Sequence, residues 1–496
     1  MRFVGGNKWL ALATGLMVAC GGTSGEDTTT EGAGGSSADS ATTSGAGAGA
    51  NSGTGGEGVG AGGQGPGPEP AAACQQTTDA IVAATGNTIT VSPGPDGQVE
   101  VEGQLRTLRA VVRDAMPGDT VLLEDGTYLL PEADPSGFSG VYITTPDITI
   151  RSASGDPRAV VLDSAYRILG GQSAPITVAA AGVVLSGFTV RRSIFHLVHF
   201  WDDGDDAVVH DVILEDGGQQ FMKASGGNVD GVTVSCSRFE MTDDGRDNVW
   251  GYGSQNGNTT CYTGGIDTHD ATNWHVHDSS FVGIYCDASG VARPAHGRAP
   301  DARNGMTYQG GLAEHAIHMW DAPDGQGHVI ERNVIVDCAR GIGIGFNAEV
   351  HDTLILNNMV SSRFAGAREH DVGISVMRAF DTLIANNTVV YTHPEAYPDG
   401  IEYRFSATAG VSVVNNLTNQ RIRARDGATA SLATNVDDAD PAWFVDAAAG
   451  DLRLLSCDVA AVVDAGTATA EVTMDLDHDP REGALDIGAD ECTPAP

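Results

Sequence analysis

Short runs of alternating apolar and polar residues recur along the chain from about residue 140 onwards. They include "AGVVLSGFTVRRS", "DAVVHDVILEDG", "GHVIERNVIVDC", "HDTLILNNMVSS" and "FDTLIANNTVVY", each a short strand, a polar turn and a second short strand. The runs return every 24 to 30 residues, which is typical of a solenoid whose repeats bury one another. Because no helical period intervenes, the pattern predicts an all-β solenoid rather than an α/β sheet.

An asparagine occupies the same place in four successive repeats. Asn333, Asn358, Asn387 and Asn416 lie 25, 29 and 29 residues apart. Asparagine tolerates the left-handed backbone conformation that a sharp turn between two strands requires. Stacked asparagine side chains can also hydrogen-bond to one another along the solenoid axis. We therefore expect these residues to adopt the turn conformation and to form a ladder.

The second strand of each repeat can be aligned on its inward apolar residue. Side chains then alternate between core and solvent with a period of two, and equivalent residues of adjacent repeats lie about 4.8 Å apart. The first outward row is predicted to contain His199, Lys223, Asp267, His318, Gly343, Ser375 and Glu402. The second outward row is predicted to contain Trp201, Ser225, His269, Trp320, Gly345, Met377 and Arg404. His318 and Trp320 would then face outward beside a floor of glycines, which predicts a cleft.

Two insertions flank this predicted cleft. The step from Met222 to Ile266 is 44 residues and the step from Ile266 to Ile317 is 51, so extra loops are expected near 242–263 and 286–311. Long loops beside a rigid surface are common places for ligand binding. The second insertion carries a local basic patch made of Arg293, His296, Arg298 and Arg303.

Both ends of the body resemble a known family. The stretch "LRAVVRDAMPGDTVLLEDGTYLL", within residues 105–130, is similar to the N-terminal cap of the chondroitinase-B-like polysaccharide lyases. Residues 451–491 resemble the closing segment of secreted bacterial β-helix proteins. The resemblance implies one right-handed parallel β-helix of the pectate-lyase-like superfamily, capped by a short helix at about 105–115. This architecture hosts lyases, hydrolases, esterases and adhesins, so it does not fix an activity.

The first twenty residues have the features of an export signal. Arg2 and Lys8 precede a short apolar run, and "LMVAC" resembles a bacterial lipoprotein lipobox ending at Cys20. The resemblance implies lipidation of Cys20 and an outer-membrane lipoprotein that faces the periplasm or the cell surface. The alternative is an ordinary secretory signal cut near Ala19. Residues 21–73 contain too few apolar residues to fold, so the expected organisation is a signal at 1–20, a linker at 21–73 and a β-helix domain at 74–496.

The charge of the chain limits its partners. The sequence has 65 acidic against 27 basic residues, a formal net charge of −38, and Lys223 is its only lysine beyond Lys8. Such a surface repels nucleic acid and anionic lipid. We expect a monomer that binds a polysaccharide and contacts a membrane only through the lipid on Cys20.

Seven cysteines follow Cys20, an odd number, so an exported chain would leave at least one unpaired. The spacings do not match a zinc site, because no CxxC is present. The expected pairs are Cys236–Cys261 and Cys457–Cys492.

The outward residues suit β-elimination from a uronic-acid polymer. Elimination needs a base for the C5 proton, a cation for the carboxylate and an acid for the leaving oxygen. Lys223 is one candidate base, with His269 or His318 as the alternative, and Asp267 can orient a histidine. The carboxylate would be held by an arginine, for which the candidates are Arg293, Arg298 and Arg303. Arg340, just before the glycines, is a further candidate for substrate binding, with a pair to Asp337 as the alternative.

Other residues are candidates for sugar contacts, and two other functions stay open. His199, Trp201, Gln220 and Trp320 are expected to bind sugar rings or hydroxyl groups. A glycoside hydrolase would use a carboxylate pair, for which Asp267 and Glu314 are the candidates. A surface carbohydrate-binding or adhesive β-helix would use the aromatic residues without catalysis. No metal ligands are assigned; Ca²⁺ is the one cofactor considered, and the cluster "DDGDD" is interpreted first as a turn.

Overall fold

The computed structural model describes residues 74, 85–133, 137–167, 169–170, 174–247, 251–253, 259–286, 312–366 and 369–493. The chain divides into two units, Met1–Gly62 and Gly63–Pro496, and every described residue belongs to the second. The predicted leader with Cys20 lies outside the described residues, and the boundary at residues 73 and 74 stays a prediction. No helix in the described part of the chain is long and apolar enough to cross a membrane.

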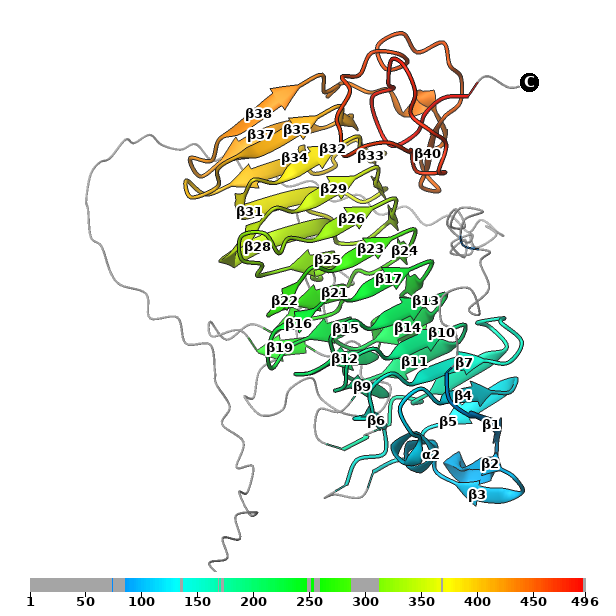
Figure 1. The fold of residues 1–496 in the computed structure, drawn as a ribbon. Coiled ribbons are helices and arrows are strands. Elements are labelled where there is room, and N and C mark those ends of the chain that lie inside the picture. The colour runs from blue at the N-terminus through cyan, green and yellow to red at the C-terminus, as the bar shows by residue number, and fades with distance from the viewer. Residues whose placement is uncertain are drawn as a thin grey trace, which may run out of the picture. The chain divides into compact units, whose positions relative to one another are not determined.

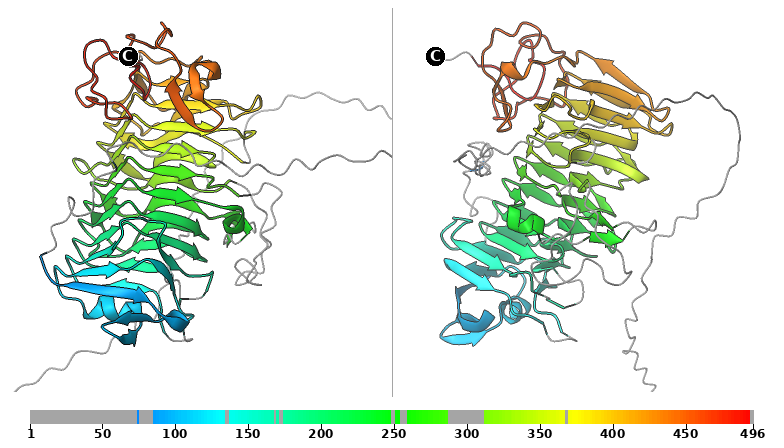
Figure 2. Two further views of the ribbon diagram at one scale, coloured as in Figure 1. Left: turned by 90° about the vertical axis from the view of Figure 1, so that its right-hand side faces the viewer. Right: turned by 180° about the vertical axis from the view of Figure 1, so that it is seen from behind.

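The body is built from three long sheets whose strands stack from one repeat to the next (Figure 1). The side and back views show the same layers rising from the N-terminal to the C-terminal repeats (Figure 2). Each turn of the chain gives one strand to each sheet, as in β13, β14 and β15. Within these three sheets, neighbouring strands pair in parallel except at β1–β2 and β2–β3. The prediction of an all-β, right-handed parallel β-helix is confirmed, and this hand is the usual one for parallel crossover connections.

The strands of the first sheet are β1 (Thr88–Pro93), β2 (Val99–Val101), β3 (Gln104–Arg106), β4 (Thr120–Leu123), β7 (Thr149–Ser152), β10 (Val184–Ser186), β13 (Val208–His210), β17 (Thr233–Ser235), β23 (His275–His277), β26 (Val329–Glu331), β29 (Leu354–Leu356), β32 (Leu383–Ala385), β35 (Val411–Val414) and β38 (Ala430–Ala433). Those of the second sheet are β5 (Gly126–Leu129), β8 (Val160–Asp163), β11 (Thr189–Ser193), β14 (Ile213–Gly217), β18 (Arg238–Glu240), β24 (Ser280–Val282), β27 (Val334–Val336), β30 (Met359–Ser362), β33 (Thr388–Tyr391) and β36 (Leu417–Thr418).

The third sheet carries the predicted outward rows and is called the site sheet below. Its strands are β6 (Val141–Ile143), β9 (Ile176–Val178), β12 (Val198–Phe200), β15 (Gln220–Ala224), β21 (Gly264–Thr268), β25 (His315–Met319), β28 (Arg340–His351), β31 (Ile374–Phe380), β34 (Asp399–Arg404) and β37 (Arg421–Arg425). The remaining elements are β16 (Val229–Asp230), β22 (Ala271–Thr272), β19 (Gly251–Gly253), β20 (Thr259–Cys261), β39 (Phe444–Asp446), β40 (Asp451–Leu454), α2 (Leu108–Asp114), α3 (Asp243–Asp247) and the 3₁₀ turns Pro95–Gly97 and Pro441–Trp443.

The core is a column of inward apolar side chains, one layer per repeat. Val198 and Phe200 of β12 are fully buried, and so are Met222 and Ala224 of β15. These are the first and third positions of the aligned strands, so the period-two prediction holds on this sheet. Burial of such side chains is the main stabilising contribution, at about 1.5–3 kcal/mol for each large one.

A hydrogen-bonded ladder of buried asparagines follows one corner of the solenoid. The Nδ2 of Asn333 donates to Oδ1 of Asn358 at 3.0 Å, and the same bond repeats from Asn358 to Asn387 and from Asn387 to Asn416, each at 2.9 Å. Each Oδ1 also accepts the backbone N–H of the preceding asparagine. The ladder continues to Asn435, so the predicted stacking is confirmed.

The predicted conformation of these asparagines is wrong by one residue. The left-handed backbone lies at the residue before each one, at Arg332, Asn357, Asn386 and Asn415, with φ between 52° and 54°. The preceding residue turns the chain at the corner, which leaves the ladder asparagine free to direct its amide along the axis.

The predicted N-terminal helix is present as α2. Its Thr107 cap accepts a hydrogen bond from the Ala110 N–H at 3.2 Å, and Leu108, Val111 and Val112 join the main core. The strand β3 replaces the first residues of the predicted helical segment, so the helix begins at Leu108 rather than near 105.

The closing segment packs against the side of the solenoid. Phe444, Leu452 and Ile487 form a second apolar cluster with outward residues of the second sheet, such as Val334 and Met359. Leu476 of the "DLDHDP" stretch belongs to the same cluster, in agreement with its interpretation as part of the cap.

The cysteines form three disulfides, Cys74–Cys236, Cys261–Cys286 and Cys457–Cys492, and leave Cys338 free and buried. The prediction of Cys457–Cys492 and of one unpaired cysteine is confirmed. The prediction of Cys236–Cys261 is wrong, because Cys236 lies at a corner between β17 and β18 whereas Cys261 is fully buried in the core.

Removal of one rung of the asparagine ladder should destabilise the fold. We expect Asn387→Ala to lower the free energy of unfolding by about 2–4 kcal/mol, because it leaves buried amide groups without partners at about 1–3 kcal/mol each. The matched control is Asn435→Ala at the half-buried end of the ladder, where water can replace the lost bonds. Equal losses in denaturant titrations of the two variants would contradict this account.

Two buried histidines should make stability depend on pH. Burial lowers the pKa of His328 and of His370 to about 4, below the ordinary value near 6.5. Between pH 6.5 and 4 the unfolded chain therefore binds protons that the folded chain does not, so stability falls as the pH is lowered through this window. His370→Asn can keep an amide donor where Nδ1 donates to the Cys338 carbonyl oxygen at 2.8 Å. We expect this variant to lose about 2–4 kcal/mol less than the parent between pH 6.5 and 4; an unchanged slope would refute the assignment.

Candidate functional site

The site sheet has the register that the sequence predicts. Backbone pairing aligns His199 with Lys223, Lys223 with Asp267 and Asp267 with His318. It then aligns His318 with Gly343, Gly343 with Ser375 and Ser375 with Glu402. The first outward row is therefore confirmed rung by rung, and the candidate residues do share one face.

Asp267 is the centre of a dense polar network. Its Oδ2 pairs with the Lys223 ammonium group, and its Oδ1 accepts a hydrogen bond of 2.6 Å from Nε1 of Trp320. His318 Nδ1 lies 3.4 Å from Oδ1, and His269 Nε2 lies 3.5 Å from Oδ2. Burial alone would raise the pKa of Asp267, but Lys223 and the hydrogen bond from His318 lower that pKa well below its usual range.

These residues are far less accessible than the predicted cleft implies. Lys223, Asp267 and His318 are 4%, 3% and 4% exposed. One reason is Trp320, whose indole contacts the rings of both His269 and His318 at centroid distances of 4.7 and 5.0 Å. The prediction of an open outward surface at these three residues is wrong, because the second outward row folds over the first.

A cavity of about 310 Å³ opens next to His318, over the later rungs of the site sheet. It is lined by Glu314, His315, His318, Trp320, Arg340, Phe346, Asp371, Val372, Ser375, Met377, Glu402, Arg404 and Arg425. The predicted glycine floor explains its position in part, because Gly343 carries no side chain between His318 and Ser375. Glu314, Trp320 and Arg340 were predicted site residues and do line it, whereas Lys223, Asp267 and His269 are not among the lining residues.

His315 is a cavity residue that the sequence pattern places on the wrong face. It lies three positions before His318, so strict alternation would direct it inward. It is the first residue of β25, at the corner, and its ring lies 4.5 Å from the His318 ring. A Cβ atom on Gly343 would lie 2.6 Å from Nε2 and Cδ2 of His315. Gly343 therefore provides the space for this imidazole. The sequence feature that could have indicated the position of His315 is this glycine, which pairs with the strand that contains "EHAIH".

Paired charges also border the cavity, and three residues of these pairs, Asp371, Tyr397 and Arg425, were not predicted from the sequence. Arg425 Nη1 lies 2.8 Å from Glu402 Oε1, and Tyr397 donates a hydrogen bond of 3.1 Å to the same oxygen. Burial, followed by a hydrogen bond with Asp399, raises the pKa of Glu402. Arg340 Nε lies 3.3 Å from Asp371, rather than pairing with Asp337, and its Nη1 donates to the Ala313 carbonyl oxygen at 2.8 Å.

The other predicted contacts lie away from the cavity. His199 Nε2 hydrogen-bonds with Ser225 at 2.9 Å, and burial together with Lys223 lowers the pKa of His199 to about 4. Trp201 is 43% exposed on the rung before Lys223. Gln220 is fully buried, and its amide has no partner among the described residues. His199 and Trp201 therefore lie on the early-rung side of the same face, whereas Gln220 is enclosed.

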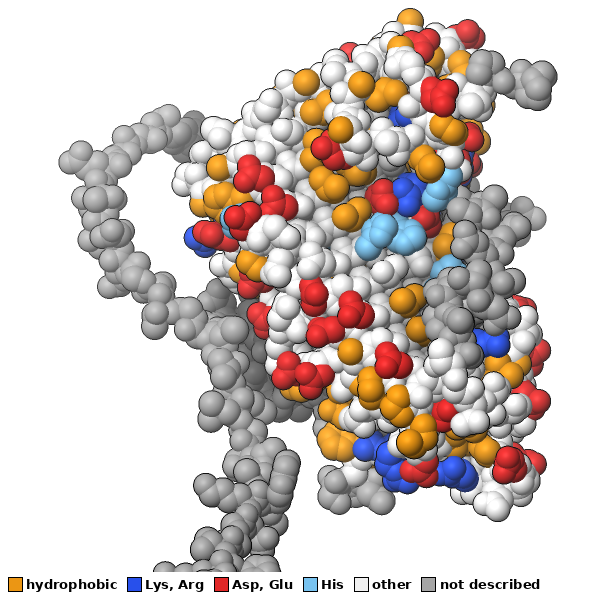
Figure 3. Space-filling view, viewed as in Figure 1, with side chains coloured by type: hydrophobic (Ala, Val, Ile, Leu, Met, Phe, Trp, Pro, Cys, Tyr) orange, Lys and Arg blue, Asp and Glu red, His pale blue; other side chains and the backbone are white. Residues whose placement is uncertain are grey.

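The predicted basic patch of Arg293, Arg298 and Arg303 lies outside the described residues, as does the lipidation site Cys20. On the face drawn in Figure 3, acidic side chains are spread widely, while Lys and Arg side chains gather in a few places.

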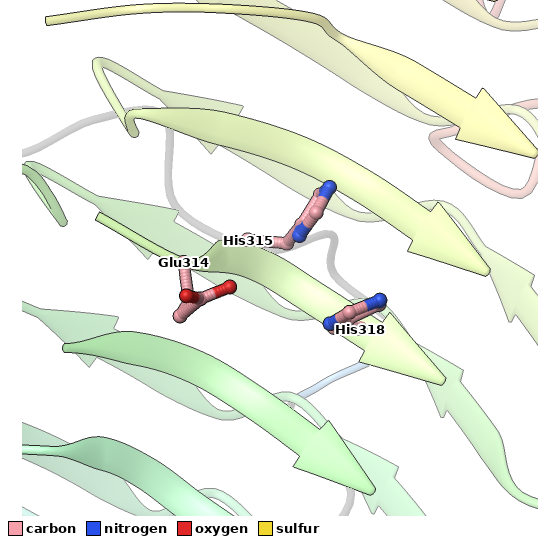
Figure 4. A group of neighbouring side chains, drawn as sticks. All are labelled: Glu314, His315 and His318. Carbon is pink, nitrogen blue, oxygen red and sulfur yellow. The ribbon is translucent and has the colours of Figure 1, made fainter. Parts of the chain in front are cut away.

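Two groups of side chains contain residue types that can bind cations. Residues 201–207 form the turn expected of "DDGDD", with Asp203 and Asp206 in left-handed conformations at φ 73° and 52°. Glu314, His315 and His318 bring a carboxylate and two imidazoles together, with donor atoms that all lie within 4.8 Å of one another (Figure 4).

Comparison with known proteins gives similarity of architecture. No family model matches the chain, and no curated protein matches its sequence. The fold is similar to that of pectate lyase Pel9A, with a TM-score of 0.43 and 14% identity over 84% of this chain and 98% of that one. The alginate lyase AlyF-OU02 has a TM-score of 0.35 and 13% identity over 63% and 68% of the two chains. The A-module of the Azotobacter vinelandii mannuronan C-5 epimerase AlgE6 has a TM-score of 0.25 and 11% identity over 66% and 92%.

The network around Asp267 should respond unequally to loss of its two charges. We expect Asp267→Ala to lower the free energy of unfolding by about 3–5 kcal/mol, because the Lys223 ammonium group is left buried without its partner. Lys223→Met should cost less, since Trp320, His318 and His269 still surround the carboxylate. Chemical denaturation of the two variants measures the difference, and an equal or reversed order would contradict it.

Proposed function

We propose that the protein is an exported, carbohydrate-active β-helix that cleaves uronic-acid polysaccharides by β-elimination, with His318 as the base. The single observation that supports this role most is the difference between the contacts of the two ring nitrogens of His318. Its Nδ1 is directed toward Asp267, and its Nε2 is buried at the cavity without a hydrogen-bond partner among the described residues. A carboxylate that fixes one nitrogen and leaves the lone pair of the other free is a common arrangement for a histidine base.

The arrangement favours His318 over Lys223 as the base. Lys223 is ion-paired with Asp267 and is not among the residues that line the cavity. His318 would remove the C5 proton of a uronate, after which the C4–O bond breaks. The imidazolium ion formed in this step can return the proton to the leaving oxygen, so no second titrating side chain is needed.

Arg340 is the proposed partner of the substrate carboxylate. It belongs to β28, the strand that pairs with β25. Two hydrogen bonds hold its guanidinium group in the cavity wall. A fixed guanidinium group stabilises the charge that develops on a carboxylate during proton removal. Trp320 and the 44% exposed Phe346, whose ring centroids are 6.0 Å apart, offer apolar faces for sugar rings.

Other parts of the proposal rest on the sequence alone. They are export of the chain, lipidation at Cys20, attachment to the outer membrane and existence as a monomer. Substrate contact by Arg293, Arg298 and Arg303 belongs with them, because these residues lie outside the described part.

A non-catalytic carbohydrate-binding role is the second candidate, and one observation favours it. The exposed aromatic residues of this face, Trp201 and Phe346, are far more accessible than His318. A polymer can therefore reach the aromatic side chains more easily than the proposed base. A hydrolase that uses Asp267 with Glu314 is less well supported, because Asp267 is enclosed by Lys223 and Trp320.

The test is an assay of the full-length protein against a panel of uronic-acid polysaccharides in the presence of a chelator. We expect an unsaturated product, detected by its ultraviolet absorbance, and a fall of about 10²–10⁴-fold in kcat for His318→Ala. Arg340→Gln should lower kcat/KM as well. The control is His275→Ala, which removes an imidazole from the first sheet instead of the site sheet.

Equal rates for the parent and His318→Ala would reject His318 as the base. Absence of product from every polymer, with binding that weakens in Trp201→Ala and Phe346→Ala, would instead support the carbohydrate-binding role.

A further inference from the structure

Glu314, His315 and His318 form a compact group of metal-binding side chain types at the start of β25. Their donor atoms lie within 4.8 Å of one another (Figure 4). All three residues line the same cavity, so an ion among them would have access to solvent or a ligand on one side.

Each of the two imidazoles has a ring nitrogen that no other described residue contacts through a hydrogen bond. His315 and His318 are 7% and 4% exposed, and their Nδ1 and Nε2 atoms, respectively, are buried without hydrogen-bond partners in the described part of the chain. Buried polar atoms are nearly always paired, so two orphans in one place need an explanation.

The surroundings resemble the second layer of a metal site. His318 directs Nδ1 toward the Asp267 carboxylate at 3.4 Å, which favours a proton on Nδ1 and a lone pair on Nε2. Metal-binding histidines commonly have such a carboxylate partner on the other ring nitrogen. The Glu314 carboxylate has no ion-pair partner among the described residues, and it supplies a negative charge to the group.

The scaffold holds these groups in a fixed arrangement. β25 is paired on both sides, with β21 and with β28, and Gly343 of β28 leaves room for the His315 ring. Zn²⁺ holds nitrogen and oxygen ligands at about 2.0–2.2 Å in a tetrahedron, which places ligand atoms about 3.4 Å apart. Side-chain rotations that shorten the present separations by up to about 1.4 Å would reach this geometry.

We propose that Glu314, His315 and His318 bind one divalent transition metal ion, of which Zn²⁺ is the representative. Two imidazoles and one carboxylate suit Zn²⁺, whereas Ca²⁺ requires six or more oxygen ligands. Three protein ligands leave a fourth position open toward the cavity, for water or for an anionic ligand.

Metal binding has a consequence that rests on the proposed function. The ion would occupy the same Nε2 lone pair that is proposed to accept the C5 proton. Zn²⁺ should therefore inhibit the elimination reaction, and a chelator should restore it.

The first experiment measures Zn²⁺ binding directly and does not depend on activity. Full-length protein is treated with EDTA, exchanged into chelator-free buffer and titrated with ZnCl₂ in a calorimeter. We expect one ion per chain, with affinity reduced by about 10–100-fold or more in His315→Ala and in Glu314→Gln. The control is the double variant His275→Ala/His277→Ala, which removes the other close pair of histidine rings, 4.2 Å apart on the first sheet, and should leave binding unchanged. CaCl₂ should give no binding at this site.

A further variant separates loss of a ligand from loss of the fold. Gly343→Ala keeps all three donors but displaces the His315 ring, so it should also weaken Zn²⁺ binding, with folding checked by circular dichroism. Wild-type affinity in folded His315→Ala, or no binding by the folded parent, would overturn the metal site. Binding by the parent that is lost in His315→Ala, in a protein without elimination activity, would support the metal site and reject the proposed function.

Discussion

Parallel, in-register pairing of successive turns is the constraint on which the rest of the structure depends. Because each strand on the site sheet pairs residue for residue with the next, a side chain that faces outward on one turn lies directly above its equivalent on the next. This arrangement brings together Lys223, Asp267 and His318, which are separated by 44 and 51 residues in the sequence. The pairing continues in register across both long separations.

The corners keep that pairing in place. The Asn333 to Asn435 ladder satisfies backbone and side-chain groups that would otherwise be buried without partners. The same repetition that stacks asparagines inside the solenoid also stacks charged and imidazole side chains on its outer face. Gly343, at the equivalent outward position of the next strand, interrupts the row of side chains. The His315 ring lies in the space that this glycine leaves, and the cavity opens over the following rungs.

The fold was predictable from the sequence because its signals are local and repeated. Alternation on the strands from Val198 to Arg404 fixed the register, and every predicted pairing of the first outward row was found. Features that depend on contacts between distant segments were not predictable. The position of His315 depends on a strand that begins at a corner, and the low exposure of Lys223 depends on the Trp320 indole folding over the row beneath it. The disulfide partner of Cys236 is Cys74, which no repeat places beside it.

The Cys74–Cys236 disulfide has a mechanical consequence. It joins a residue that precedes the first strand to a corner between β17 and β18, across 162 residues of sequence. A pulling force applied upstream of residue 74 would therefore pass through this covalent bond to the repeat that contains Cys236. The earlier repeats, from β1 onwards, would carry little of that load and would not be unfolded by it. The turns beside β15 and β21 would bear the load instead.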